Sequence, residues 1–428
     1  DAIIASIDGA NIWQRIRHIT LPSLIPTMVI MGLLAVGQIF RGDFGLFYQL
    51  VGNNAVILKA ADILDTFIYR SLMQTNDYGM SSAAGLYQSC LCFITILIVN
   101  KIVKIIEPDY TLFESKFAER RVNRMKRKNK IFQADLAAFK LLGYVLVFIW
   151  GMLCFLPFLL VVMNSFTSEA NIMRNGYSFW PGEWTLEAYK TCLENPERIG
   201  FAYRNTIIAT IVGTVLSVLM STMTGYVLHR KDFPWRNGFS FFFYFTTLFN
   251  GGLVPWYLMC TRYLGFKNNY LALVVPMLFS VWQMILAKNF MKGGIPFEII
   301  ESAKVDGAND FTIYWKLVIP LAKPLIATLS LFAALTFWND WYNCMLFMNK
   351  NNMKNLQYFL HEMLSSIQAL QELVSMGKVN LLNEESANLP QQSMKMAMTC
   401  ITTGPILLLY PFVQKYFVKG LTIGAVKG

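Results

Sequence analysis

Long apolar segments constrain the fold of this chain more than any other feature of its sequence. Each can cross a bilayer, because a helix of about 20 apolar residues spans the hydrocarbon core and satisfies its own backbone hydrogen bonds. Charged residues make up only 15% of the chain, against about 25% in soluble domains. We therefore predict an all-α fold, a polytopic transmembrane helical bundle. The apolar segments are Leu24–Phe40, Ala83–Ile106 and residues 138–163, 204–228, 238–260, 270–290, 325–347 and 394–418.

A polar segment between two of these apolar segments occurs twice. One copy is Pro296–Pro324 and the other is residues 1–26. Such an internal repeat predicts that two parts of the chain share one local structure. The residues that are identical in register are Ala5 and Ala303, Asp8 and Asp306, Gly9 and Gly307, Ala10 and Ala308, Asn11 and Asn309, Pro22 and Pro320, and Pro26 and Pro324.

Each copy is predicted to form a short helix, a glycine turn and a second helix. Apolar residues recur at helical spacing after Pro296, and proline is tolerated in the first turn of a helix. Gly307 has no Cβ and can adopt the left-handed conformation that ends a helix, and Asn309 follows as an N-cap. By its shape alone, such a hairpin is equally suited to lying on a membrane surface.

The second copy closely resembles a family signature. Glu301-Ser302-Ala303, Asp306-Gly307-Ala308 and Ile319-Pro320 are similar to the cytoplasmic loop of permease subunits in binding-protein-dependent ABC importers. In that family the loop is the coupling helix, which docks into a groove on the ATPase subunit. The first copy has Ile3 in the position of Glu301 and lacks its charge. The resemblance implies ATPase coupling by Glu301, Ala303, Asp306, Gly307 and Ala308, and by Asp8, Gly9 and Ala10 in the first copy.

The distribution of positive charge predicts the orientation and the domain organisation. Lysine and arginine crowd into residues 114–136, as the positive-inside rule expects of a cytoplasmic loop. They are also more frequent on the coupling-loop side of the later spans, which places the C-terminus inside. Because Asp109–Phe113 resembles the end of a permease, we expect the C-terminal part of a first permease before the basic linker. The expected divisions are residues 1–113, the linker 114–136, and a complete six-span permease at 137–428 with its coupling loop at 291–324.

Several function classes are disfavoured by what the sequence lacks. No G-x-x-x-x-G-K-[ST] motif occurs, so any ATP hydrolysis must come from a partner. The seven cysteines and three histidines have no metal-ligand spacing, and we expect no metal, no cofactor and no catalytic residue. The net charge of +11 is concentrated in the linker, which argues against nucleic-acid binding. We therefore expect a transport protein, not an enzyme.

The apolar segment 325–347 carries polar groups between aromatic residues toward its outer end. An ionisable group near a span usually faces inward and is functional, and aromatic rings beside amide and carboxylate groups suit a sugar. The same composition fits an interfacial aromatic belt, so both interpretations stay open. In the first copy, Arg41 and Gly42 occupy the positions of Asn339 and Asp340. The candidates for a substrate path are Trp338, Asn339, Asp340, Trp341 and, in segment 270–290, Gln283.

Three further segments, Gly176–Phe179, Phe249–Pro255 and Gly420–Gly428, resemble parts of carbohydrate importers. The similarity to the maltose-permease class, in its polysaccharide and oligosaccharide branch, implies a plasma-membrane permease for an oligosaccharide or related carbohydrate. It also implies three partners: a cytoplasmic ABC ATPase dimer, an extracytoplasmic sugar-binding protein and a partner permease. One alternative is an ion-coupled secondary transporter, which also uses broken helices, although few ionisable residues lie in the spans. A membrane scaffold without transport is another.

Overall fold

The structure, a computed structural model, is helical in the residues that it describes and confirms the all-α prediction. Extended pairing among these residues is limited to one isolated bridge between Thr167 and Trp184. The predictions on Asp8, Gly9 and Ala10, on the basic cluster of the linker and on Gly420–Gly428 fall outside the described residues. The described residues are 14, 16–20, 32, 35, 39–51, 60–75, 77–106, 133–194, 196–249, 251–375 and 391–407.

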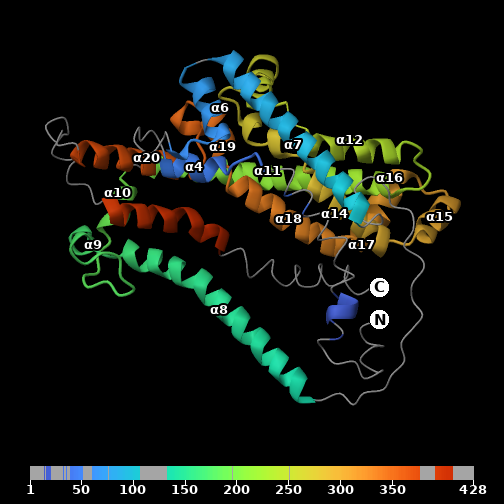
Figure 1. Cartoon of the computed structure of the whole chain (residues 1–428), viewed down its shortest axis with the longest axis horizontal. Coiled ribbons are helices and arrows are strands. Elements are labelled where there is room, and N and C mark those ends of the chain that lie inside the picture. Colours follow the sequence, from blue (N-terminus) through green and yellow to red (C-terminus); the bar gives the residue numbers. More distant parts are fainter. Residues whose placement is uncertain are drawn as a thin grey trace. The chain divides into compact units, whose positions relative to one another are not determined.

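Figure 1 labels the main helices of the described residues. Up to the long helix α11 they are η1 (Ile16–Thr20), α4 (Phe44–Val51), α6 (Leu64–Met73), α7 (Tyr78–Ile106), α8 (Gln133–Ser165), α9 (Glu169–Asn175), α10 (Glu187–Cys192) and α11 (Pro196–His229). From there to the bend before α18 they are α12 (Arg236–Leu248), α13 (Leu253–Leu258), η3 (Met259–Tyr263), η4 (Tyr270–Leu273), η5 (Val275–Met277), α14 (Val281–Gly294), α15 (Phe297–Val305), α16 (Asp310–Ile313), η6 (Tyr314–Val318) and α17 (Ile319–Leu321). The last are α18 (Lys323–Trp338), α19 (Tyr342–Phe347), η7 (Asn351–Met353), α20 (Leu356–Ser375) and a helix at residues 391–407.

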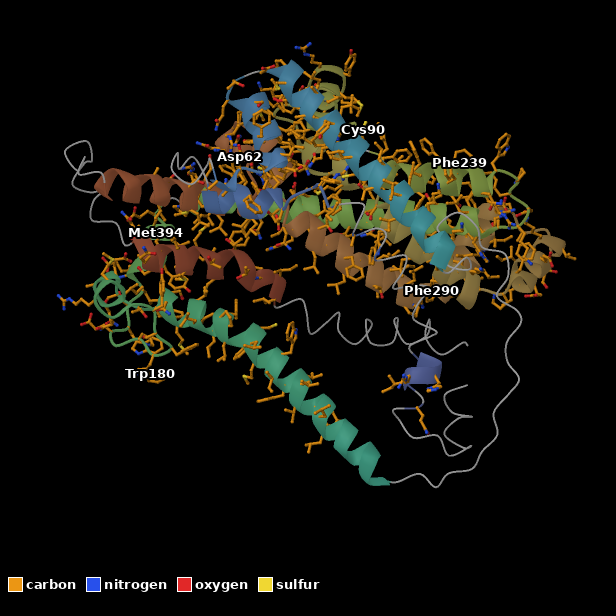
Figure 2. The ribbon with its side chains drawn as sticks, viewed as in Figure 1. Asp62, Cys90, Trp180, Phe239, Phe290 and Met394 are labelled. Carbon is orange, nitrogen blue, oxygen red and sulfur yellow. The ribbon has the colours of Figure 1, made fainter. Side chains whose placement is uncertain are left out.

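The chain divides into two compact units, and the first comprises residues 1–156, 245–256 and 428. Within it α6 packs against α7; Figure 2 labels Asp62, just before α6, and Cys90, on α7. The Asp65 carboxylate joins three parts of this unit. Its Oδ2 accepts hydrogen bonds from the backbone N of Gly42 (2.8 Å) and from Nε2 of Gln88 (3.0 Å).

The second unit, residues 157–244 and 257–427, is organised around α11. Helices α14 and α18 run beside α11, as Figure 1 shows. A Cβ on Gly213 would lie 2.5 Å from ring atoms of Phe337 in α18. One on Gly225 would lie 2.7 Å from the Cβ of Ala287 in α14. Small residues at such crossings let membrane helices pack closely, so these two glycines determine how near α14 and α18 approach α11.

Three described helical segments are long and apolar enough to cross a membrane: Tyr78–Val99, Leu141–Ser165 and Pro196–His229. The number rises to five if each of two bent helix pairs is one span. The pair Tyr270–Met277 and Val281–Gly294 bends by 47°, and the pair Asp310–Leu321 and Lys323–Trp338 by 83°. These segments overlap five of the predicted apolar segments.

Two predicted spans are broken within their length. In 238–260, α12 ends before a break at Gly252, whose φ of +91° lies in the region that favours glycine. A Cβ there would also meet the Cα of Gly85 at 3.6 Å. In 325–347, α18 ends before Asp340, and the Asp340 carboxylate accepts the backbone N–H of Asn343 (3.1 Å) in the first turn of α19. In the first case a glycine with a positive φ interrupts the apolar run, and in the second an aspartate that caps the next helix does so.

Candidate functional site

The segment from α14 to α18 forms the helix, turn and helix that the repeat predicts. Helix α15 ends at Val305, and Gly307 follows with a φ of +80°. The backbone N of Ala308 donates to the carbonyl of Ala303 (3.0 Å), which closes the turn. Asn309 caps α16, because its Oδ1 accepts from the backbone N of Thr312 (2.8 Å). The predicted glycine turn and asparagine cap are therefore confirmed.

One face of this segment is packed into the second unit. Ile300 of α15, Ile313 of α16 and Val318 of η6 are buried in an apolar cluster with residues of α11, α14 and α18. Ala303 and Ala308 are half-buried and pack against the same cluster. Burial of these residues fixes α15 and the arm from α16 to α17 on the ends of the long helices.

The opposite face is exposed and partly apolar. The side chains of Val305, Phe311 and Trp315 are 88%, 68% and 52% exposed, respectively. Glu301, Asp306 and Gly307 are also exposed. We call Val305, Phe311 and Trp315, together with Gly307 between them, the apolar corner. Large apolar side chains held out by a packed scaffold are typical of a surface that contacts another protein.

Charged residues tie this segment to the connection between α11 and α12. The Arg230 guanidinium pairs with both Asp232 and Asp310. The Asp232 carboxylate also accepts from Nζ of Lys304 at 2.6 Å. These contacts lower the pKa of Asp232 well below its ordinary value and raise that of Arg230, chiefly through the hydrogen bond that the two residues share.

The predicted path residues at the end of α18 differ in exposure. Trp338 is buried, and its Nε1 donates to the carbonyl of Thr402 (3.3 Å) in the 391–407 helix. Asp340 is also buried, whereas Asn339 is exposed and Trp341 half-exposed. The Trp341 ring lies 4.9 Å from the His361 ring of α20, measured between centroids. The structure therefore brings these four together at one helix end, with only part of the group facing outward.

Asp340 belongs to a buried polar joint. Its Oδ1 accepts from both the backbone N and Nδ2 of Asn343, each at 3.1 Å, and its carbonyl accepts from Nδ2 of Asn355. The backbone N of Asn355 in turn donates to Sγ of Cys344 (3.3 Å). These bonds connect α18, α19 and the start of α20. Asp340 thus holds the C-terminal end of α18 in place, a role that the sequence alone does not reveal.

Gln283 lies apart from that group. It is buried on α14, and its Oε1 accepts from Oγ of Ser217 in α11 (3.3 Å). Its described contacts do not reach residues 338–341. Among the residues that the structure describes, no cluster of histidine, cysteine and carboxylate groups is arranged to hold a metal ion.

Of the segments that resemble carbohydrate importers, Gly176–Phe179 is held by several hydrogen bonds. Ser178, in the Gly176–Phe179 motif, is held by Asn164, whose Oδ1 accepts from its backbone N (3.2 Å) and whose Nδ2 donates to its carbonyl (2.9 Å). The neighbouring Tyr177 hydroxyl donates to Oε1 of Gln392 (2.8 Å). The Phe249–Pro255 motif contains the break at Gly252 described above.

Sequence reasoning missed the two residues that hold the loop from outside it. Arg230 counts in the sequence only as one of several cytoplasmic positive charges, and Asp232 has no signal. Their partners Lys304 and Asp310 are more than 70 positions away, so no local pattern joins them. The only sequence hint is that the short connection carries charges of both signs, in Arg230-Lys231-Asp232.

Comparison with known proteins gives one family for this chain. Residues 217–423 match the family model of the binding-protein-dependent transport system inner membrane component. The polygalacturonan/rhamnogalacturonan transport system permease protein YtcP of Bacillus subtilis (strain 168) is 34% identical over 306 residues, which are 70% of this chain and 100% of the relative. Protein LplC of the same organism is 35% identical over 65% of this chain and 91% of its own length.

Further similarities are weaker in sequence and extend to a solved structure. The arabinooligosaccharides transport system permease protein AraQ of Halalkalibacterium halodurans is 26% identical over 71% of this chain and 100% of the relative. A crystal structure of a bacterial ABC transporter involved in the import of the acidic polysaccharide alginate matches with a TM-score of 0.56 and 29% identity. The match covers 66% of this chain and 97% of that one.

Proposed function

This chain belongs to the family of binding-protein-dependent transport system inner membrane components, and from this premise we propose that it carries an oligosaccharide across the plasma membrane. The energy comes from ATP hydrolysed by a separate subunit. The substrate class is supported by the relatives, whose names specify polygalacturonan, rhamnogalacturonan and arabinooligosaccharides, and by the alginate importer structure. Because two of these sources name acidic polysaccharides, oligosaccharides that contain uronic acid are the first candidates.

The apolar corner is the observation that carries this proposal. It exposes three large apolar side chains on a segment whose other face is buried, so the chain presents a preformed surface to a partner. An ATPase dimer that docks there moves the ends of α11, α14 and α18 directly, since α15 and η6 pack on them. Glu301, Ala303, Asp306, Gly307 and Ala308 form or support this surface, and Asp8, Gly9 and Ala10 are proposed to do the same in the first copy.

The remaining partners follow from the same proposal. A sugar-binding protein delivers the substrate on the outer side, where the Gly176–Phe179 loop and the α18 end lie, and a partner permease completes the path. The C-terminus then lies inside. Of the five proposed path residues, Asn339 and Trp341 contribute exposed groups, while Trp338, Asp340 and Gln283 shape the helices behind them.

Residues 39–106 support the proposal of a second, partial permease before the linker. The register that places Gly9 on Gly307 also places Phe44, where α4 begins, on Tyr342, where α19 begins. It places α6 within α20, and the later part of α7 on the 391–407 helix. The same order of elements in both regions supports the divisions at 1–113, 114–136 and 137–428.

ATP-driven uptake in proteoliposomes tests the proposal. The chain is reconstituted with its ATPase, its binding protein and its partner permease, and uptake of oligogalacturonides is compared with that of neutral arabinooligosaccharides. We expect uptake that requires ATP inside and the binding protein outside. Uptake driven by a proton or sodium gradient without ATP would instead establish the ion-coupled alternative, and no uptake of any oligosaccharide would leave the scaffold interpretation.

A further inference from the structure

The coupling segment, residues 296–324, has two helical arms: α15 before Gly307, and α16 to α17 after it. The connection between α11 and α12 contacts both arms. We propose that Arg230, Asp232, Lys304 and Asp310 form a clamp that transmits movement of the coupling segment to α11. The four are positioning residues: none is part of the apolar corner, and each acts through the placement of α15 and α16. The inference rests on the proposed function, which it deepens by naming the route from the docking surface into the membrane helices.

The contacts of the clamp cross the glycine turn on both sides. Asp232 holds α15, because its Oδ2 accepts from Nζ of Lys304 at 2.6 Å. Arg230 holds α16 through the carboxylate of Asp310. Arg230 and Asp232 also pair with each other, so the two arms are joined through one pair of side chains. A further contact on the α15 side places Nζ of Lys231 5.3 Å from the centroid of the Phe297 ring.

Arg230 is the central residue of the clamp, because it pairs with both aspartates and has the least exposed side chain of the four. Its side chain is 12% exposed, whereas those of Asp232, Asp310 and Lys304 are 40%, 58% and 37% exposed. It directly follows the last residue of α11, and its guanidinium lies 5.8 Å from the Tyr226 ring in that helix. Two positive and two negative groups balance in charge. A largely covered, paired arginine at the end of a long helix is therefore fixed to both arms of the segment at once.

The turn itself supplies no side-chain contact that restrains the angle between the arms, so this angle depends on the packing of each arm and on contacts from outside the turn. Gly307 lies at the corner with a φ of +80°, and a Cβ placed there would have no heavy atom within 4 Å. The backbone bond from Ala308 to Ala303 closes the turn but does not reach the far ends of the arms. The clamp bonds Lys304, in the last turn of α15, and Asp310, the first residue of α16. The clamp is therefore placed to hold the two arms and the turn between them as one rigid body against α11.

The test compares charge-removing variants within the reconstituted complex. Asp232→Asn and Lys304→Gln keep the size of the side chains but remove the shared ion pair. We expect the ATPase subunit to co-purify at the unaltered level, while sugar imported per ATP hydrolysed falls roughly threefold to fivefold, the size of a lost partly exposed ion pair. Asp232→Glu should restore most of the loss. Lys316→Gln, which removes an exposed charge of η6 outside the clamp, is the matched control and should import normally.

A second readout does not depend on transport. Spin labels at Ser302 in α15 and at Val227, an exposed residue near the end of α11, report the distance between the first arm and the helix to which the clamp is proposed to fix it. The seven cysteines of the chain are replaced beforehand. We expect a narrow distribution that broadens in Asp232→Asn and narrows again in Asp232→Glu. If the complex shows no ATP-driven uptake but the distance distribution still broadens in Asp232→Asn and narrows again in Asp232→Glu, the proposed function fails and the clamp stands. An unchanged distribution in Asp232→Asn overturns the clamp, as does loss of ATPase binding in that variant or an equal loss of import in Lys316→Gln.

Discussion

At the scale of single residues, the turn of the coupling segment depends on Gly307. Its φ of +80° costs a β-branched residue roughly 1–2 kcal/mol, and a valine would move the arms apart to relieve that strain. We predict that Gly307→Val inserts normally but loses most ATPase co-purification and most uptake. Gly293→Val is the matched control, since Gly293 lies in α14 and a Cβ there meets nothing within 4 Å. Full ATPase binding in Gly307→Val would contradict a role for the turn.

Asp232 supports a prediction about pH. Its pKa is lowered in the folded chain by the hydrogen bond from Arg230, so its ionised form stabilises the fold at pH values above its ordinary value of 3.8. That contribution is lost only as the pH falls through the lowered folded pKa. The difference in thermal unfolding midpoint between the unaltered chain and Asp232→Asn should therefore be constant from about pH 5 to 8 and shrink below about pH 4. A difference that already disappears near pH 6 would show that Asp232 is not held by this ion pair.

The same residues show what sequence can and cannot predict. Gly307 and Asn309 were predictable, because a turn and a cap depend on chemistry within a few residues. The pairing of Arg230 with Asp310 was not, since it depends on how α11 packs against the segment. Burial of Trp338 and Asp340 was not predictable either. Polar and aromatic residues at the end of a span are equally compatible with facing a substrate path and with packing against a neighbouring helix.

At the scale of elements, helix packing is set at small residues. A Cβ on Gly213 would lie 2.5 Å from the Phe337 ring, so in Gly213→Ala this buried ring must shift within the packed crossing of α18 and α11. We predict a loss of about 1–3 kcal/mol in stability, as in other overpacked cores. Thermal unfolding in detergent measures it. Gly200→Ala, on the same helix but with nothing within 4 Å of its Cβ, should be neutral or slightly stabilising, and an equal loss there would refute the packing argument.

Sequence located the apolar elements well, and Gly251, Gly252 and Pro255 are recognisable in it as helix disruptors, but the break before Asp340 has no such signal. The predicted segment 204–228 ends within one residue of the end of α11, because nothing interrupts its apolar run, but the helix begins earlier, at Pro196. The breaks at Gly252 and Asp340 fall inside apolar runs that are long enough to span unbroken. A glycine or an aspartate can be accommodated within a membrane helix, so only its actual contacts show whether the helix stops there.

At the scale of the whole molecule, the orientation is open to direct measurement. The proposal places Asn237 of α12 inside and Asn175, the last residue of α9, outside. An impermeant maleimide should label Asn175→Cys in intact cells and Asn237→Cys only after permeabilisation. Both positions are exposed, so access from the solvent is matched. Labelling of Asn237→Cys in intact cells would reverse the topology and remove the coupling segment from the ATPase.

Fold class follows from the sequence at this scale because apolar length and the bilayer leave few solutions. The proposed division into a partial permease, a linker and a complete permease follows less directly from the sequence. The internal register aligns α4 with α19, yet the residues around Asp8 and the linker lie outside the described part, so the first copy rests on sequence alone.

The central claim is that the apolar corner docks an ATPase, and one measurement tests it most directly. Phe311→Asp places a charge where a 68% exposed ring is proposed to be buried by the partner. Tyr263→Asp makes the same change at an 84% exposed ring of η3, away from the corner. The measurement is the amount of ATPase that co-purifies with each variant. We predict that Phe311→Asp retains less than about a tenth of the unaltered amount, because loss of a central interface residue costs about 2 kcal/mol of binding free energy. Tyr263→Asp should retain all of it, whereas full ATPase recovery with Phe311→Asp would contradict the account.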